Sequence, residues 1–478
     1  MSELKQKTVN GLLWGTIERF SVQGVSFLIM LIMARLLTPS DYGLIGMLAI
    51  FMAVAQTLID SGFSSALIRK QDRTEKDVST VFYFNIAVSG IIYAIFYILA
   101  PFVAEFYNEP QLEPIMRVLC LIIIINSFAV VQRVIYTAKI DFKSQAKASL
   151  TAAAISGIAG IIIAYQGYGV WALVVQQLVN AVVNTGILWF MSSWFPKWIY
   201  SWRSFRELFG FGAKILVAAL METIYNNIYP IIIGKVFSAS ELGHYTRASH
   251  FSTFPSSNLT GIVEKVSYPA LCKLQNDDER LAYNYRRIIK LSAFIVFPLM
   301  LGLSAIAHPL IIIIIGDKWE YCSHLLAIIC FGMMWYPIHS MNVGLLQVKG
   351  RSDLFLRLEI IKKILGIVVL CVTIPFGLVI MCYGMIFSSV MCLFINTYYT
   401  GKLINVGFFK QMGDILPFFC VSFAMWLLVH ASQLISSNLY IQLLIGIAVG
   451  VLTYMTAITF LFKNEWNDVI EMIPFKRK

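Results

Sequence analysis

Apolar runs of about 20 residues, separated by short polar segments, recur along the whole chain. Each run is long enough to cross the hydrocarbon core of a bilayer as an α-helix. The pattern therefore predicts an all-α, polytopic membrane protein with fourteen transmembrane helices. The predicted helices cover 10–33, 42–66, 79–104, 114–136, 148–165, 169–191, 212–234, 244–268, 289–314, 322–347, 356–375, 379–400, 413–433 and 440–462.

The composition agrees with this pattern and narrows the function classes. Hydrophobic residues make up 58% of the 478 residues and charged residues only 13%, which excludes a soluble protein built around one large core. The eight cysteines include no C-x-x-C pair, so neither a disulfide framework nor a metal site is indicated. The first apolar run contains Glu18 and Arg19, so we interpret it as the first membrane helix and not as a removed signal peptide.

Basic residues collect in alternate loops of the predicted topology. One side carries 28 lysines and arginines, whereas the other side carries only Arg35, Lys235 and Lys318. Because cytoplasmic loops of membrane proteins are rich in Lys and Arg, the basic side is expected to be cytoplasmic, with both termini there. The net charge of +11 is thus a topology signal, and no nucleic acid partner is expected.

One helix–corner–helix segment occurs twice. Residues 34–47 read ARLLTPSDYGLIGM, and residues 234–247 read GKVFSASELGHYTR without a gap in register. A second echo relates 139–173 to 349–383. Internal repeats of this length are typical of secondary transporters. The matched positions are Arg35 with Lys235, Ser40 with Ser240, Asp41 with Glu241, and Gly43 with Gly243.

The repeat predicts how the chain is divided. We expect an N-terminal lobe of six helices over 1–191 and a homologous six-helix lobe over 212–400. Residues 192–211 hold three tryptophans among basic residues, which is typical of a linker lying in the headgroup layer. Residues 401–478 would form two further helices and a cytoplasmic C-terminal tail.

Polar residues inside the helices are the candidate site, because a charge at membrane depth is costly unless it faces a partner or a wet cavity. They recur on one face of predicted helices 1, 7 and 8. The candidates are Glu18, Arg19, Gln23, Lys214, Glu222, Asn226, Arg247 and His250. The alternative is that the charged members form interlobe ion pairs. Asp60, Arg117, Arg133, Lys362 and Lys363 lie near helix ends and are expected to extend to the headgroups.

Enzymatic chemistry is not indicated. The chain has no P-loop, and its six histidines include no H-E-x-x-H spacing. The external loops are also too short to hold an active site. We therefore expect neither an enzyme nor a cofactor.

Several segments together resemble a known family. They are ARLLTPSDYGLIGM (34–47), LIDSGFSSALIRK (58–70), YGVWALV (168–174), ELGHYTRASHF (241–251), VSYPALCKLQND (266–277) and IGDKWEYCSHLLAII (315–329). They are similar to Wzx-type flippases, in the polysaccharide transporter branch of the multidrug/oligosaccharidyl-lipid/polysaccharide exporter superfamily.

The resemblance implies two six-helix lobes in a V around a central cleft, with two extra C-terminal helices. It implies transport of undecaprenyl-diphosphate-linked oligosaccharides across the bacterial inner membrane for lipopolysaccharide, O-antigen or capsule synthesis. A polysaccharide polymerase and a chain-length regulator are implied partners, beside membrane lipid. By analogy of helix and depth, Arg19, Lys214 and Arg247 would meet the diphosphate.

Two other function classes stay open at this point. A cation-coupled multidrug exporter of the same superfamily would need membrane acids, and Glu18, Asp60 and Glu222 are available. Basic residues close to these acids make such a site less attractive. A structural membrane protein would explain neither the duplication nor the charges within the helices.

Overall fold

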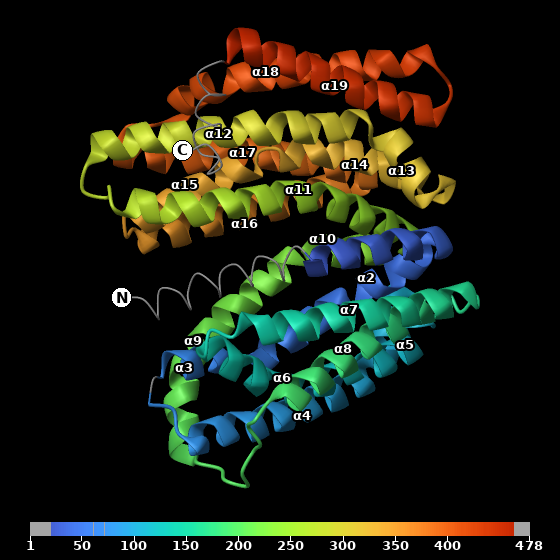
Figure 1. Ribbon diagram of the computed structural model, residues 1–478, viewed down its shortest axis with the longest axis vertical. Coiled ribbons are helices and arrows are strands. Elements are labelled where there is room, and N and C mark those ends of the chain that lie inside the picture. The colour runs from blue at the N-terminus through green and yellow to red at the C-terminus, as the bar shows by residue number, and fades with distance from the viewer. Residues whose placement is uncertain (1–20, 61, 71, 463–478) are drawn as a thin grey trace. The chain divides into compact units, whose positions relative to one another are not determined.

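The computed structural model describes residues 21–60, 62–70 and 72–462, without the side chains of residues 65, 211 and 214. These residues form helices and connecting turns, with no strand among them, which confirms the all-α prediction (Figure 1). A helix over Ser21–Leu36 comes first. It is followed by α2 (Pro39–Asp60), α3 (Phe63–Arg69), α4 (Glu75–Tyr107), α5 (Leu112–Leu119), α6 (Leu121–Ala138), α7 (Phe142–Tyr165), α8 (Trp171–Met191), α9 (Trp202–Asn226), α10 (Ile228–Val236), α11 (Ala239–Cys272), α12 (Asp278–Ala305), α13 (Ala307–Ile315), α14 (Glu320–Met333), α15 (Tyr336–Val348), α16 (Ser352–Thr373), α17 (Leu378–Ile404), α18 (Phe408–Ser432) and α19 (Leu439–Leu461).

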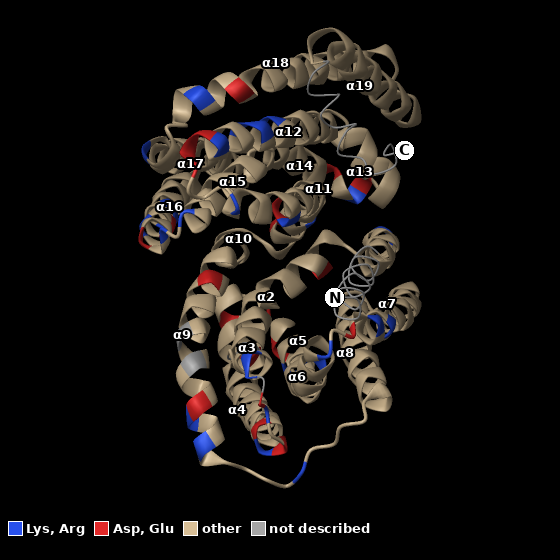
Figure 2. Ribbon diagram, turned by 60° about the vertical axis from the view of Figure 1, so that its left-hand side comes forward, with Lys and Arg blue, Asp and Glu red and all other residues tan. Residues whose placement is uncertain are grey.

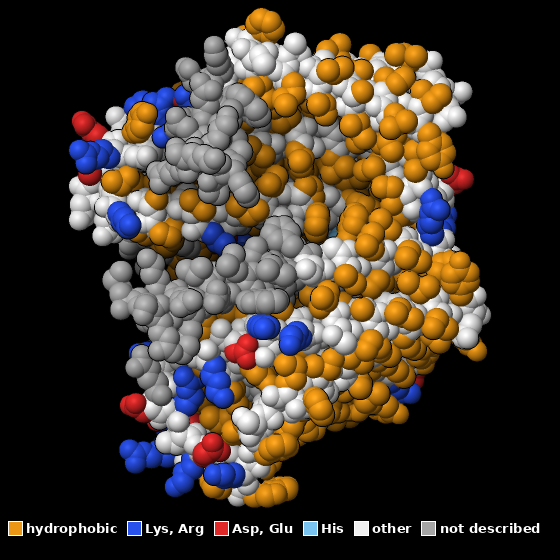
Figure 3. All heavy atoms as spheres, viewed as in Figure 1, with side chains coloured by type: hydrophobic (Ala, Val, Ile, Leu, Met, Phe, Trp, Pro, Cys, Tyr) orange, Lys and Arg blue, Asp and Glu red, His pale blue; other side chains and the backbone are white. Residues whose placement is uncertain are grey.

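Ten helical segments within the described residues are long and apolar enough to cross a membrane. An eleventh is added if the bent pair Trp202–Gly210 and Ile215–Asn226 is one span. The chain is therefore a multi-pass membrane protein, and hydrophobic side chains spread over the face seen in Figure 3. Ten of the fourteen predicted helices match these segments. The other four are 10–33, of which only part is described, 212–234, 244–268 and 356–375.

The chain forms two compact units, Met1–Gly243 and His244–Lys478. The division falls just after α11 begins, whereas the sequence analysis placed the change of lobe between 191 and 212. The lobe boundaries therefore stay a prediction.

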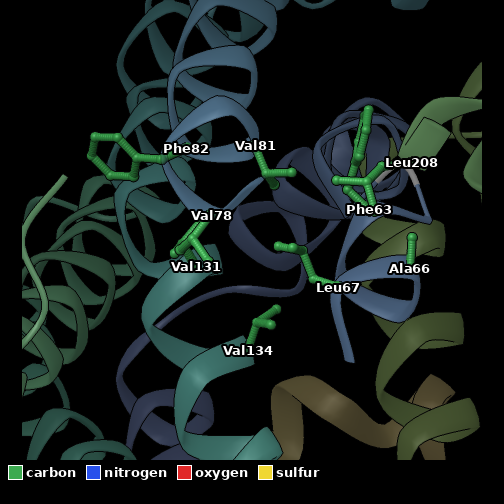
Figure 4. Packing of buried hydrophobic residues seen from close by; sticks show 9 residues of the cluster. All are labelled: Phe63, Ala66, Leu67, Val78, Val81, Phe82, Val131, Val134 and Leu208. Carbon is green, nitrogen blue, oxygen red and sulfur yellow. The ribbon is translucent and has the colours of Figure 1, made fainter. Parts of the chain in front are cut away.

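In the first unit, an apolar cluster joins α3, α4, α6 and α9 (Figure 4). Phe63 of α3 is fully buried in it, and Leu208 brings in α9. A Cβ added to Gly62, where φ is 69°, would lie 2.6 Å from the Cα of Gly212. The backbone of α9 thus passes directly against the turn between α2 and α3, which only glycine permits. The cluster comprises Phe63, Ala66, Leu67, Val78, Val81, Phe82, Val131, Val134 and Leu208.

The segment between α8 and α9 is tied to the first turns of α4. The backbone N–H of Lys197 donates to Ser79 Oγ at 3.2 Å, and that of Ser201 donates to Thr80 Oγ1 at 3.0 Å. Trp198 is 93% exposed and stacks on Tyr83 with ring centroids 5.4 Å apart. The predicted linker 192–211 is irregular only to residue 201, and its second part forms the beginning of α9.

In the second unit, α18 is attached to the other helices by a buried carboxylate. Asp414, 5% exposed, accepts two hydrogen bonds from Arg286 of α12, at 2.6 and 2.8 Å. Charged residues are sparse along the helices, as Figure 2 shows. One turn earlier, Gln411 is hydrogen-bonded to Asn342 of α15 and Thr400 of α17. These polar contacts fix the first part of α18 against three neighbouring helices.

The duplicated segments have the same local structure. At the start of α2, the carboxylate of Asp41 accepts from the backbone N–H and hydroxyl of Thr38, at 2.8 and 2.7 Å. At the start of α11, Glu241 accepts from the hydroxyl of Ser238 at 3.1 Å. In both places the backbone N–H of the acid donates back to that hydroxyl oxygen. The repeated sequence therefore forms the same capped helix N-terminus in both places.

Candidate functional site

The polar helices identified from the sequence are α9 and α11. Neither passes as a single continuous apolar span, although α11 is 34 residues long. Polar membrane helices are stable where they face protein or a wet cavity instead of lipid. These two helices are thus the part of the described chain best suited to contact a polar ligand.

The structure places the sequence candidates on three helices. Glu222 and Asn226 are exposed, one turn apart on the same face of α9. Lys214 lies on the same helix, but its side chain is not described. Gln23 is half-buried in the helix over Ser21–Leu36.

The remaining candidates lie elsewhere. In the second unit, α11 carries Arg247, which is half-buried, and His250, which is exposed. Glu18 and Arg19 lie outside the described residues. Glu222 and Asn226 are brought together within one unit, whereas the convergence of all candidates on one cleft stays a prediction.

A break separates α9 from α10. Pro230, which can kink a helix, lies within the predicted helix 212–234, and α9 ends at Asn226, four residues earlier. Proline has no N–H to donate to the carbonyl four residues before it, so the helix is interrupted there. The side chain of Asn227 compensates by donating to the carbonyl of Thr223 at 2.8 Å.

A polar cluster lies between α2 and α6 in the first unit, and the sequence indicates only its α2 side. Gln56 donates to both carboxylate oxygens of Asp60 at 3.4 Å, and Asn126 of α6 donates to Gln56 at 3.4 Å. Thr57 and Thr223 hydroxyls lie 3.0 Å apart, which extends the polar contacts to α9. The spacing of Gln56 and Asp60 by four residues was the available signal.

A corresponding polar contact occurs in the second unit. Glu264 of α11 accepts a hydrogen bond from the hydroxyl of Ser340 of α15. A cavity of about 400 Å³ opens beside this pair. Asp60 and Glu264 are both distant from the duplicated corners, roughly 30–40 Å along their helices at 1.5 Å per residue. Each unit therefore has a polar group near the far end of a helix that begins at one of the duplicated corners.

Two of the cations that were expected to extend to the headgroups form ion pairs with a neighbouring residue on their own helix. Lys362 pairs with Glu359 at 2.5 Å and is only 17% exposed. It lies ten residues inside α16, roughly 15 Å from the start of that helix. Arg117 pairs with Glu113 at 2.8 Å and covers the ring of Tyr97 at 4.5 Å. A local ion pair limits the cost of each partly buried cation.

The two duplicated corners pack against each other inside the first unit. A Cβ added to Gly43 would lie 1.7 Å from the carbonyl oxygen of Ala239. A Cβ added to Gly243 would lie 1.8 Å from the carbonyl oxygen of Pro39. Since these pairs correspond in the repeat, the contact is reciprocal. Two helix starts approach to backbone contact, and both copies need glycine for it.

No metal site is evident in the part of the chain that the structure describes. Among those residues, no group of three His, Cys, Asp or Glu side chains could hold a metal ion. The arrangement instead offers charged and amide side chains along otherwise apolar helices. Such side chains can form hydrogen bonds and ion pairs with a polar ligand.

Comparisons with known proteins agree with this picture. The sequence profile of a family described as polysaccharide biosynthesis protein matches residues 32–324. The lipopolysaccharide biosynthesis protein WzxC of Escherichia coli K12 is 22% identical over 76% of this chain and 74% of its own length. The teichuronic acid biosynthesis protein TuaB of Bacillus subtilis 168 is 22% identical over 95% of this chain and 96% of its own. These matches confirm the resemblance inferred from the sequence motifs.

A solved structure shows the same fold. The lipid II flippase MurJ, in an inward closed conformation, matches with a TM-score of 0.76 at 15% identity. The match covers 96% of this chain and 100% of that one.

Proposed function

The chain belongs to the polysaccharide biosynthesis protein family, and on that premise we propose that it is a flippase for lipid-linked oligosaccharides. Its substrate would be an oligosaccharide on undecaprenyl diphosphate, moved from the cytoplasmic to the outer leaflet of a bacterial inner membrane. The carrying observation is the family match over 32–324, supported by the polar helices α9 and α11 within an apolar bundle.

The names of the relatives support this class of substrate. WzxC and TuaB are named for the biosynthesis of lipopolysaccharide and teichuronic acid, and a succinoglycan biosynthesis transport protein, ExoT of Rhizobium meliloti 1021, also matches. All three names concern surface polysaccharides of different composition. A polysaccharide polymerase and a chain-length regulator are the partners that such a pathway implies.

The proposed architecture has fourteen membrane helices, with both termini in the cytoplasm. Two six-helix lobes would form a V around a central cleft, and α18 and α19 would be the additional pair. The repeated helix starts at Thr38 and Ser238 support this duplication. Four of the fourteen helices are too polar, broken or incompletely described to pass as apolar spans, and helices lining a wet cleft are expected to be polar.

Substrate binding is assigned to the cationic candidates. A diphosphate carries about two negative charges, and arginine can hold phosphate oxygens in a bidentate manner. Arg19, Lys214 and Arg247 would bind the diphosphate. Glu18 and Glu222 would neutralise these cations between substrates, while Gln23, Asn226 and His250 would hydrogen-bond to the headgroup.

The paired corners are the proposed closure on the outer side of the membrane. Alternating access requires that one side be sealed while the other is open. Backbone contact at Gly43 and Gly243 excludes side chains from the contact, and so it can form a tight seal. Opening would separate the two helix starts.

Reconstituted protein provides the test. In liposomes that hold a fluorescent undecaprenyl-diphosphate-linked glycan, we expect the full chain to expose the glycan to an impermeant glycosidase added to the opposite face. Arg247→Gln should slow this exposure about tenfold, the loss of one charge-assisted hydrogen bond. Arg203→Gln, a basic residue at the start of α9, is the matched control.

The alternative function, a cation-coupled drug exporter, predicts a different result in the same liposomes. Efflux of ethidium along a cation gradient, without translocation of the glycan lipid, would refute the flippase. Unchanged glycan translocation in Arg247→Gln at equal protein content would instead remove that residue from the binding site.

A further inference from the structure

The cavity between α11 and α15 has a lining unlike that of the proposed diphosphate site. It contains one carboxylate, Glu264, and one ammonium, Lys265, so its formal charges cancel. The other polar groups are hydroxyls and an amide. Its lining residues are Glu264, Lys265, Ser267, Tyr268, Leu271, Ser340, Met341, Val343, Gly344, Gln347 and Val348.

These groups suit a ligand that both donates and accepts hydrogen bonds. The Glu264 carboxylate has one identified donor, Ser340, and retains further acceptor positions. The Gln347 side chain is exposed and provides both a donor and an acceptor. Tyr268 is 41% exposed and adds a flat apolar surface with a polar tip.

The space is open on the α15 side. A Cβ added to Gly344 would have no atom within 4 Å, so the wall beside Glu264 is not filled by protein. At about 400 Å³, the cavity falls within the usual range of small-molecule sites. A carboxylate on a membrane helix beside unfilled space indicates a wet cavity and not a lipid contact.

We propose that this cavity is a glycan subsite, which binds sugar rings of the transported lipid through Glu264, Gln347 and Tyr268. The inference rests on the proposed function, since it names the part of the substrate that this cavity recognises. A diphosphate is a poor ligand here because the Glu264 carboxylate offsets the attraction that Lys265 would provide. Sugar hydroxyls, in contrast, match the carboxylate and amide, and an apolar face of a sugar ring can pack on Tyr268.

The experiment compares two probes that differ only in the sugar. Binding of bare undecaprenyl diphosphate, and of undecaprenyl diphosphate carrying a disaccharide of N-acetylglucosamine, is measured on the purified full chain in detergent. We expect the wild type to bind the glycosylated lipid about tenfold more tightly. Glu264→Gln and Gln347→Ala should each remove most of this preference and leave the affinity for the bare lipid within about twofold.

Controls separate the subsite from folding and from the proposed function. Gln275→Ala, an exposed glutamine beyond the end of α11, should retain the preference. If Glu264→Gln does not fold, Gln347→Ala alone decides the outcome. The Gln347 side chain is exposed, so its removal is not expected to disturb folding.

Three outcomes overturn the inference in different ways. Equal affinity of the wild type for both probes, or full preference in both variants, rejects the glycan subsite while the flippase stands. Failure of the wild type to bind either probe rejects the flippase itself. If phosphatidylglycerol by itself abolishes the preference for the glycosylated lipid, the cavity binds a phospholipid headgroup and not a glycan.

Discussion

At the scale of single residues, backbone conformation recurs between the two halves of the chain. Ile140 has φ of 58° and Gly350, 210 positions later, has φ of 67°. Asn108 and Gly316 also have positive φ, of 56° and 100°, but their ψ values of 35° and 166° differ, so only the sign of φ recurs there. Ile140 and Gly350 each lie just after a helix end, where a left-handed residue satisfies the last carbonyls. Glycine and asparagine are the usual residues there, so Ile140 is the strained member.

The positive φ of Gly350 predicts that a glycine-to-alanine substitution has opposite effects on stability at Gly350 and at Gly413. A Cβ added to Gly350 or to Gly413 meets no atom within 4 Å. Gly350→Ala should lower stability by about 1 kcal/mol, because alanine is disfavoured in the left-handed region. Gly413→Ala, inside α18, should raise it by roughly 0.5 kcal/mol. Apparent melting temperatures in detergent provide the measurement, and a loss of stability in both variants would show that packing, not φ, decides.

At the scale of elements, the helices proposed to bind substrate are those with poor hydropathy. α9 is broken before Pro230, and α11 is too polar to pass as a span. These two helices fall short of a continuous apolar span because acidic residues, Glu222 in α9 and Glu264 in α11, lower their hydropathy. Both helices can exist in a membrane because protein packs along part of their surface, as α3 does against α9 through the cluster that contains Phe63 and Leu208.

The paired corners give the prediction at this scale. Gly43→Ala would force the carbonyl of Ala239 away and favour the open arrangement. We expect glycan translocation to fall about tenfold, with a severalfold faster reaction of a cysteine placed at Ser240 with an impermeant thiol reagent. Gly90→Ala, in α4 with open space around it, is the control. Wild-type translocation and labelling in Gly43→Ala, at normal abundance, would contradict a sealing role.

At the scale of the whole molecule, the proposed topology follows from the distribution of charge. With 28 basic residues on one side and three on the other, an odd change in the number of spans would reverse every later loop. The count of fourteen therefore depends on α9 with α10, α11 and α16 crossing despite their polar residues. Lys362 and Glu359 illustrate how α16 can do so, because they neutralise each other.

Reporter fusions test that topology. A periplasmic reporter joined after Asn108 should be active, and a cytoplasmic reporter joined after Lys402 should be active, since basic loops are retained inside. Each site also receives the opposite reporter as its control. A periplasmic signal after Lys402 would mean that an odd number of the polar helices does not cross.

The sequence by itself determined the membrane class, ten of the spans, the repeated helix starts and the family. These depend on local properties: apolar length, the spacing of polar residues along one helix, and motifs such as TPSD and SASE. Only the tertiary structure decided that α9 packs on α3 and α4, that Gly43 lies on Ala239, and that a cavity opens beside Glu264. Those contacts join residues far apart in the chain, and a helical pattern specifies which face is polar but not which helix it meets.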